Sequence, residues 1–286
     1  MDDEIIIGVN KKISSNNKKN NKGNKKKKQN KNLHKNKKIN KKKKVVSPKL
    51  KIMLPIIAII FLVMLLLSSR LFNIKTIEVE GNSKISDEKI ISLSSIELYT
   101  NIFRINKRNI REKIKENAYI ENISISTHLP STLILTVEER EPKYMLQFAD
   151  SYVYINNQGY MLEISNEKID IPILIGFTTD LSNIKAGNRI NIEDLKKMDM
   201  VIKIYEAAKS NDLGNLITKI DISNDKNYTI MLETEGKRVY LGDCSDLNTR
   251  ILYLKSILEK SAGQNGEIFL NIDLNLQNAY FRPSSN

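Results

Sequence analysis

Residues 52–69 read IMLPIIAIIFLVMLLLSS, an uncharged run of eighteen residues that lies between Lys51 and Arg70. As an α-helix this run would reach roughly 27 Å, close to the ~30 Å hydrocarbon thickness of a bilayer. Pro55 lies in the first turn, where a missing N–H is tolerated. A buried core helix rarely runs this far without a polar residue, which argues against that alternative. A cleaved signal peptide is the second alternative, and no signal-peptidase cleavage site follows the run. We therefore predict a transmembrane helix over residues 52–69 that is retained as a signal anchor.

The lysines of the chain gather before this run. Residues 1–51 hold 19 Lys and three acids, a net charge of +16, whereas the whole chain carries +13, so residues 52–286 carry −3. By the positive-inside rule the tail stays in the cytoplasm and the bulk of the chain is exported.

The tail at 1–51 is also too poor in apolar residues to fold, and we expect it to be disordered. Its lysines can contact anionic lipids of the cytoplasmic membrane. We expect no specific nucleic-acid partner, because no aromatic residue alternates with the lysines to stack on bases. A solvated topology signal without any ligand is the simpler alternative.

The exported part, residues 70–286, is long enough for two small domains. Its single cysteine, Cys244, excludes an internal disulfide, so packing must stabilise the fold. In its first half, alternation predicts strands over 74–80, 120–127 and 132–139. Two helices, capped by Ser86 and Asn106, are expected between the first two strands. This order of elements predicts a compact α+β unit with helices on one face of a small sheet.

Four short motifs in this half resemble a known family. They are GN at 81–82, YIENI at 119–123, LPSTL at 129–133 and VEEREP at 137–142. Their order, and their position just outside a single anchor, resemble the polypeptide-transport-associated (POTRA) domain of the bacterial division proteins FtsQ and DivIB. The resemblance implies a β-α-α-β-β POTRA domain over residues 70–142.

The second half, residues 143–286, resembles the β domain of the same family, a mixed and strand-rich unit. The landmarks are the Leu-Gly-Asp turn at 241–243, the helix after it and the strand around 272–274. We expect hairpins at 152–164 and 228–241, a short strand at 171–177 that Pro172 places at an edge or a strand start, and a strand at 217–222. Helices are expected over 192–209 and after a cap at Ser245 or Asp246, and a terminal strand over 268–276.

Candidate catalytic residues are few. The two histidines, His34 and His128, fall in the tail and in a turn, so they assemble no dyad, triad or metal site. Glu138 and Glu139 are adjacent on a strand and point to opposite faces, which suits a salt-bridged strand end better than paired carboxylates. Cys244 has no base nearby in the sequence. We interpret the chain as a non-enzyme without a cofactor or a metal site.

The terminal strand offers a different chemistry, because an open sheet edge can accept a strand from another protein. The family resemblance implies that FtsB/DivIC-like and FtsL-like division proteins dock there. Carried over by position, the partner-binding residues are Leu274, Asn275, Leu276, Tyr280 and Phe281. The simpler alternative is that these residues only close the β domain.

Two functions fit these observations: a scaffold of the division septum that helps regulate septal peptidoglycan synthesis, or a membrane-anchored POTRA receptor for polypeptide export. An exported wall hydrolase would need a carboxylate or histidine constellation that the sequence lacks.

Overall fold

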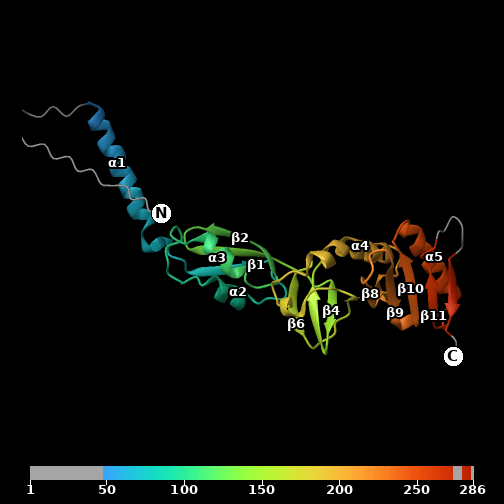
Figure 1. The fold of residues 1–286 in the computed structure, drawn as a ribbon. Helices are drawn as coiled ribbons and strands as arrows, with labels where there is room; N and C mark the ends of the chain where they lie inside the picture. Colours follow the sequence, from blue (N-terminus) through green and yellow to red (C-terminus); the bar gives the residue numbers. More distant parts are fainter. Residues whose placement is uncertain (1–47, 273–278, 285–286) are drawn as a thin grey trace, which may run out of the picture. The chain divides into compact units, whose positions relative to one another are not determined.

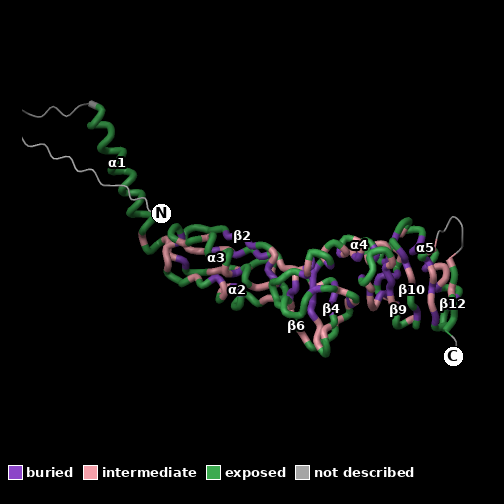
Figure 2. The backbone as a smooth tube through the Cα atoms, in the orientation of Figure 1, coloured by how far each residue is buried: buried purple, intermediate pink, exposed green. Residues whose placement is uncertain are grey.

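A single long apolar helix begins the described part of the chain. The structure is a computed structural model, and it describes residues 48–272 and 279–284. Helix α1, Pro48–Leu67, is exposed from Lys49 to its last residue (Figures 1 and 2). Among the described residues it is the one helix long and apolar enough to cross a membrane. It covers the predicted run except for Ser68 and Ser69, which follow its end.

A three-stranded sheet with two helices follows α1, as the sequence predicts. The sheet order is β1-β3-β2, with β1 parallel and β2 antiparallel to the central strand β3. The two helices lie between β1 and β2 in the sequence, so the β-α-α-β-β order is confirmed. The bounds are β1 Thr76–Glu80, α2 Asp87–Ser94, α3 Lys107–Ile114, β2 Ile120–His128 and β3 Thr132–Glu139.

The helix starts and the core of this domain follow from local chemistry. Ser86 caps α2, accepting a hydrogen bond from the Lys89 amide at 3.3 Å, and Asn106 caps α3 through two amides at 3.1 Å. Both predicted caps are therefore confirmed. The apolar faces of the helices pack on one face of the sheet. The fully or almost fully buried side chains include Ile90, Ile110, Ile114, Leu133 and Leu135.

The acidic end of β3 confirms the predicted salt-bridged strand end only in part: Glu141 pairs with Lys143 at 2.6 Å, whereas Glu139 binds backbone amides. The Glu139 carboxylate accepts backbone N–H bonds from Lys84 at 2.8 Å and from Ile85 at 2.9 Å. Arg140 donates through Nη1 to the carbonyls of Ala118 and Ile120. Glu139 therefore fixes the loop after β1 instead of pairing with a cation, because the turn aims two amides at it.

The rest of the chain builds a nine-stranded sheet in the order β12-β11-β10-β9-β8-β7-β4-β5-β6. The pairs β4–β7, β7–β8 and β10–β11 are parallel and the others are antiparallel. The strand bounds are β4 Tyr144–Phe148, β5 Ser151–Ile155, β6 Met161–Ser165, β7 Ile173–Ile175, β8 Lys219–Asp221, β9 Tyr228–Leu232, β10 Lys237–Gly242, β11 Gly266–Phe269 and β12 Tyr280–Pro283.

Two helices cover one face of this sheet (Figure 1). They are α4, Ile192–Lys209, and α5, Leu247–Lys260. Met198, Val201 and Ile204 of α4 join Ile251 and Leu254 of α5 in the main core. The opposite face carries a smaller cluster of Met145, Tyr154 and Ile173, against which the segment at 169–171 packs.

Pro172 directly precedes β7, which confirms the strand-start alternative predicted for it. β7 lies between β4 and β8, and the Pro172 carbonyl accepts the Met145 N–H at 2.9 Å. The predicted terminal strand at 268–276 is confirmed only at 268–269, and it is not the last strand of the sheet. β11 ends at Phe269 and pairs on both sides, and β12 forms the outer edge.

Candidate protein-binding edge

β12 is one outer strand of the nine-stranded sheet, and its one neighbour in that sheet is β11. The two strands are antiparallel, with Phe269 opposite Tyr280 and Gly266 opposite Pro283. The side of β12 that faces away from β11 carries main-chain groups with no strand partner in the described sheet. Such an edge can take up an added strand.

Tyr280 and Phe281 point to opposite faces of β12, as neighbours on a strand must. Phe281 is half-buried and packs against the main core, and the Nζ of the buried Lys237 lies 5.8 Å from its ring centroid. Tyr280 is 47% exposed on the face away from α5. At this edge the Tyr280 side chain is therefore accessible from outside, whereas the Phe281 side chain packs inward and attaches β12 to the core.

The Tyr280 ring is the outermost of three aromatic rings stacked across neighbouring strands. Its centroid lies 4.8 Å from that of Phe269, which lies 4.9 Å from that of Tyr240, with interplanar angles of 15° and 19°. Stacked pairs of this kind contribute about 0.5–1.5 kcal/mol beyond their buried area. The stack therefore restrains the Tyr280 ring at the outer edge of the sheet.

Hydrogen bonds between charged and polar side chains hold β11 and β12 together on the face that carries the Tyr280 ring. The Tyr240 hydroxyl donates to Glu267 Oε1 at 2.7 Å, and Arg282 donates to Glu267 Oε2 from Nε at 3.1 Å and also from Nη2. The Arg282 guanidinium lies 4.6 Å from the Phe269 ring centroid. The hydrogen bonds from Arg282, and then that from Tyr240, lower the pKa of Glu267, so its carboxylate stays charged at neutral pH.

Gly266 lets β12 approach β11 closely. A Cβ atom at this position would lie 2.3 Å from the Arg282 carbonyl oxygen and 2.6 Å from the Phe281 ring. A side chain of any size would therefore push β12 outward. The absence of a side chain at Gly266 is a condition for this edge.

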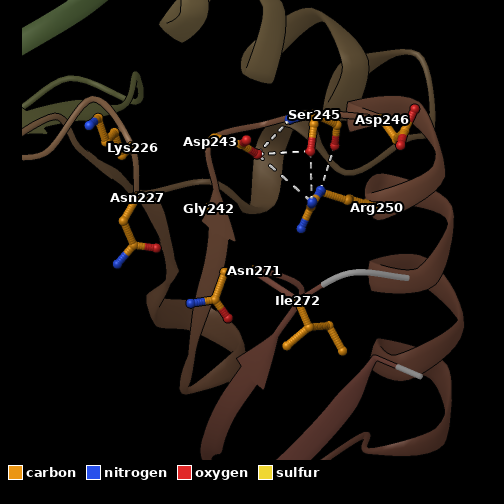
Figure 3. A pocket seen from close by; sticks show the side chains of 9 residues that line it. All are labelled: Lys226, Asn227, Gly242, Asp243, Ser245, Asp246, Arg250, Asn271 and Ile272. Atoms are coloured by element: carbon orange, nitrogen blue, oxygen red, sulfur yellow. Dashed lines mark hydrogen bonds and ion pairs between the residues drawn. The ribbon is translucent and has the colours of Figure 1, made fainter. Parts of the chain in front are cut away.

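A cleft of about 760 Å³ lies beside the end of β10 and the start of α5 (Figure 3). Arg250, which is 6% exposed, lines this cleft. It donates hydrogen bonds to the Ser245 carbonyl at 2.5 Å and to the Ser245 hydroxyl at 3.0 Å. Hydrogen bonds from the Ser245 amide and hydroxyl lower the pKa of Asp243, whose Oδ1 lies 3.9 Å from Arg250 Nη2. Arg250 thus ties down the turn that leads into α5. The predicted cap residue Asp246 precedes α5 but makes no side-chain capping bond.

The structure describes only part of the predicted site. Tyr280 and Phe281 lie on β12, whereas Leu274, Asn275 and Leu276 lie outside the described residues. The stacked rings of Tyr240 and Phe269 and the ion pair of Glu267 with Arg282 are not predictable from the sequence pattern. Alternation marks each of these residues as facing one side of its strand, but only the register between strands brings them together.

The described residues hold no group of three or more His, Cys, Asp or Glu side chains that could bind a metal ion. Cys244, the free cysteine, is buried, and burial raises the pKa of its thiol to about 12. A thiol in this state is protonated and a poor nucleophile at neutral pH.

Comparison with known proteins connects both domains to bacterial division. The family model described as POTRA domain, FtsQ-type, matches residues 72–140, and the model described as cell division protein FtsQ/DivIB, C-terminal, matches residues 145–275. The fold and these matches define a POTRA-containing protein, with one candidate membrane helix in the part of the chain that the structure describes.

Relatives that match about 70% of this chain agree. A cell division protein DivIB of Clostridium botulinum is 30% identical over 206 residues, which cover 71% of this chain and 80% of the relative. A DivIB of Clostridium tetani is 29% identical over 218 residues, 71% of this chain and 76% of the relative. A cell division protein FtsQ of Syntrophotalea carbinolica is 24% identical over 195 residues, 68% of this chain and 67% of the relative. The chain belongs to the FtsQ/DivIB family of cell-division proteins, which is a scaffold-type family and not a known enzyme family.

Proposed function

We propose that this protein is a scaffold of the division septum that joins FtsL-like and FtsB/DivIC-like proteins and helps regulate septal peptidoglycan synthesis without any turnover of its own. Its chain divides into a cytoplasmic tail at 1–51, a membrane helix at 52–69, a POTRA domain at 70–142 and a β domain at 143–286. The family matches at 72–140 and 145–275 support the two exported domains.

The topology of this proposal rests on charge. The +16 tail lies before the apolar helix and the −3 remainder after it, which favours a cytoplasmic N-terminus and exported domains. The tail then lies at the cytoplasmic leaflet, where each lysine near an anionic surface contributes about 1 kcal/mol to attraction. Anionic lipids are accordingly its nearest partner.

The observation that carries the scaffold function is the outer edge at β12, with its exposed and stacked Tyr280. A partner strand laid along β12 would gain main-chain hydrogen bonds, and its side chains on the Tyr280 face would meet a ring that the stack already holds in place. Preorganised aromatic rings are common anchors of binding energy, because little side-chain entropy is lost on binding. Leu274, Asn275 and Leu276 precede this strand and complete the proposed interface.

The test measures binding of the full chain, reconstituted in nanodiscs, to the cognate DivIC-like protein. We expect Tyr280→Ala to weaken binding by roughly 30-fold, the loss of about 2 kcal/mol that marks an anchor residue. Tyr253→Ala is the matched control, because Tyr253 is a tyrosine on α5 that is 37% exposed. Equal affinities for the two variants would remove β12 as the docking site.

A second test addresses the septal role in cells. We expect septal localisation to survive deletion of residues 11–44 and to be lost with deletion of the exported domains. Normal septa in cells that lack the exported domains would contradict the proposed function.

A further inference from the structure

Exposed apolar side chains gather at one end of the three-stranded domain. They come from the link after α1, the loop between α2 and α3, and the turn between β2 and β3. We call them the membrane-proximal patch: Leu71, Leu98, Tyr99, Phe103 and Leu129, each 49–71% exposed. Apolar side chains grouped on a surface in this way mark a contact with a protein or a lipid.

Backbone hydrogen bonds hold this loop against the link that leaves α1. The Ile74 N–H donates to the Thr100 carbonyl at 2.9 Å, and the Tyr99 N–H donates to the Ile74 carbonyl at 2.8 Å. The Ile102 N–H donates to the Phe72 carbonyl at 2.8 Å, and the Phe72 and Phe103 ring centroids lie 5.3 Å apart. The loop is therefore fixed to residues 72–74 and does not move independently of them.

The turn that carries Leu129 is fixed at the same end. The Lys75 N–H donates to the Ser131 carbonyl at 2.9 Å, and Thr76 and Thr132 begin β1 and β3 side by side. Leu129 therefore joins the link and the loop at the end where the chain enters the domain.

This end lies next to the membrane helix. Asn101 Nδ2 donates to the carbonyl of Leu67, the last residue of α1, at 2.9 Å. Phe72 follows Leu67 by five residues, which span at most about 18 Å when fully extended, and the 3₁₀ turn at Arg70–Phe72 shortens that reach. The headgroup layer on each side of a bilayer is roughly 5–8 Å thick. If α1 spans the bilayer, the patch lies at the depth of the headgroups.

The side chains suit that depth. Tyr99 is the most exposed member, at 71%, and its φ of 68° is a left-handed conformation that bulky residues seldom adopt. Tyrosine is enriched at membrane interfaces, where its ring is apolar and its hydroxyl stays hydrated. The exposed cations Arg70 and Arg104 accompany the patch and can pair with lipid phosphates, while Glu97 is the exposed acid beside it.

We propose that the membrane-proximal patch is a lipid-binding surface, which inserts into the headgroup layer of the outer leaflet and holds the POTRA domain against the membrane. This inference rests on the membrane anchorage in the proposed function. Its ligand is the bilayer that α1 itself crosses, because the loop that carries Leu98, Tyr99 and Phe103 is hydrogen-bonded through Asn101 to the last residue of α1.

The chain contains no tryptophan, so one introduced tryptophan reports a single position. Tyr99→Trp is placed in the full chain, reconstituted in phosphatidylcholine–phosphatidylglycerol vesicles with or without dibrominated acyl chains. We expect a blue-shifted emission that loses most of its intensity to the brominated lipid and little to aqueous acrylamide. Leu252→Trp is the matched control, because Leu252 is 58% exposed on α5; its emission should be quenched by acrylamide and not by the lipid. Phe103→Trp provides a second reporter in case the left-handed position 99 does not accept tryptophan.

The other outcomes are distinguishable. The proposal would be overturned if acrylamide, and not the brominated lipid, quenched the tryptophans at both positions 99 and 103. It would also be overturned if neither quencher reached these tryptophans, since protein would then cover the patch. Equal lipid quenching of the control would show unspecific adsorption and would overturn it as well. Flotation of the vesicles reports the anchor separately: protein that fails to float refutes the membrane anchorage, whereas floating protein with an unquenched patch refutes the lipid-binding surface alone.

Discussion

Replacing Gly266 by alanine should loosen the outer edge of the sheet. Gly266 has no left-handed φ, so alanine is conformationally permitted there and would normally stabilise the strand. The added Cβ, however, would lie 2.3 Å from the Arg282 carbonyl oxygen, a separation below the 3.0 Å that real Cβ atoms keep. β12 must therefore move outward by roughly 0.7 Å or more, because the blocking atom is backbone and cannot rotate away.

The size of the effect follows from that movement. A shift of this size lengthens ladder N···O distances from about 2.9 Å to about 3.6 Å, beyond hydrogen-bonding range. Each lost bond costs about 1 kcal/mol, and overpacking costs about 1–3 kcal/mol. We expect a local loss of about 2–3 kcal/mol, which is larger than the gain of about 0.5–1 kcal/mol from replacing glycine.

Hydrogen exchange read by mass spectrometry, peptide by peptide, measures this loss. The net loss of about 1–2.5 kcal/mol should make amides of β11 and β12 exchange roughly 5- to 70-fold faster in Gly266→Ala, while those of β1 and β3 stay unchanged. Gly263→Ala is the control: no atom lies within 4 Å of its Cβ, and its φ of +74° makes alanine cost about 1 kcal/mol through the backbone alone. Unchanged or slower exchange in β12 of Gly266→Ala would refute the steric argument.

Three further predictions concern the interior of the β domain. The Cys244 thiol should resist labelling by maleimide at pH 8 until denaturant is added, and fast labelling of the folded chain would contradict its burial. Burial raises the pKa of this thiol from 9.0 to about 12. The stability that the buried neutral thiol contributes is therefore complete below pH 9 and is lost as the pH rises toward 12. Asp194→Ala should lower the free energy of unfolding, measured in urea, by about 2–3 kcal/mol. The fully buried Asp194 carboxylate accepts hydrogen bonds from the Thr178 and Thr179 amides at 2.9 and 2.7 Å, and its removal leaves these buried donors without an acceptor. A change below about 1 kcal/mol would contradict this role of Asp194. Ile230→Ala truncates a fully buried side chain of β9 and should lower the free energy of unfolding by about 4 kcal/mol in the same assay. A loss of less than about 2 kcal/mol would show that the core relaxes around the cavity, and would contradict the prediction.

Local signals predict much of the chain because they act within a few residues. The apolar run, the caps at Ser86 and Asn106, and the helix at Ile192–Lys209 all follow from neighbours in sequence. In the last helix Asp246 occupies the N-cap position, as one of the two predicted alternatives has it, but its backbone is left-handed with φ of 48° and its side chain makes no capping bond.

Other features depend on partners far away in the sequence. β4 was not predicted, because Tyr144, Met145 and Leu146 are all buried, and a strand covered on both faces shows no alternation. The sequence leaves open whether Pro172 marks an edge or a strand start, and it misplaces the last strand at 268–276, for a related reason: which strands become edges depends on pairing across the whole sheet. The same pairing creates the ring stack that ends at Tyr280, so the proposed binding edge can be predicted from the sequence only in outline.

The shortness of β12 sets a limit on how the edge can be used. The strand has four residues and ends in Pro283, which has no N–H to donate, so any added strand can gain only a few main-chain bonds. A generic β segment would therefore be held too weakly to stay, and a second copy of this chain would gain no more. In the proposed scaffold, selectivity therefore comes from side chains of the partner that recognise the Tyr280 face, and not from main-chain hydrogen bonds.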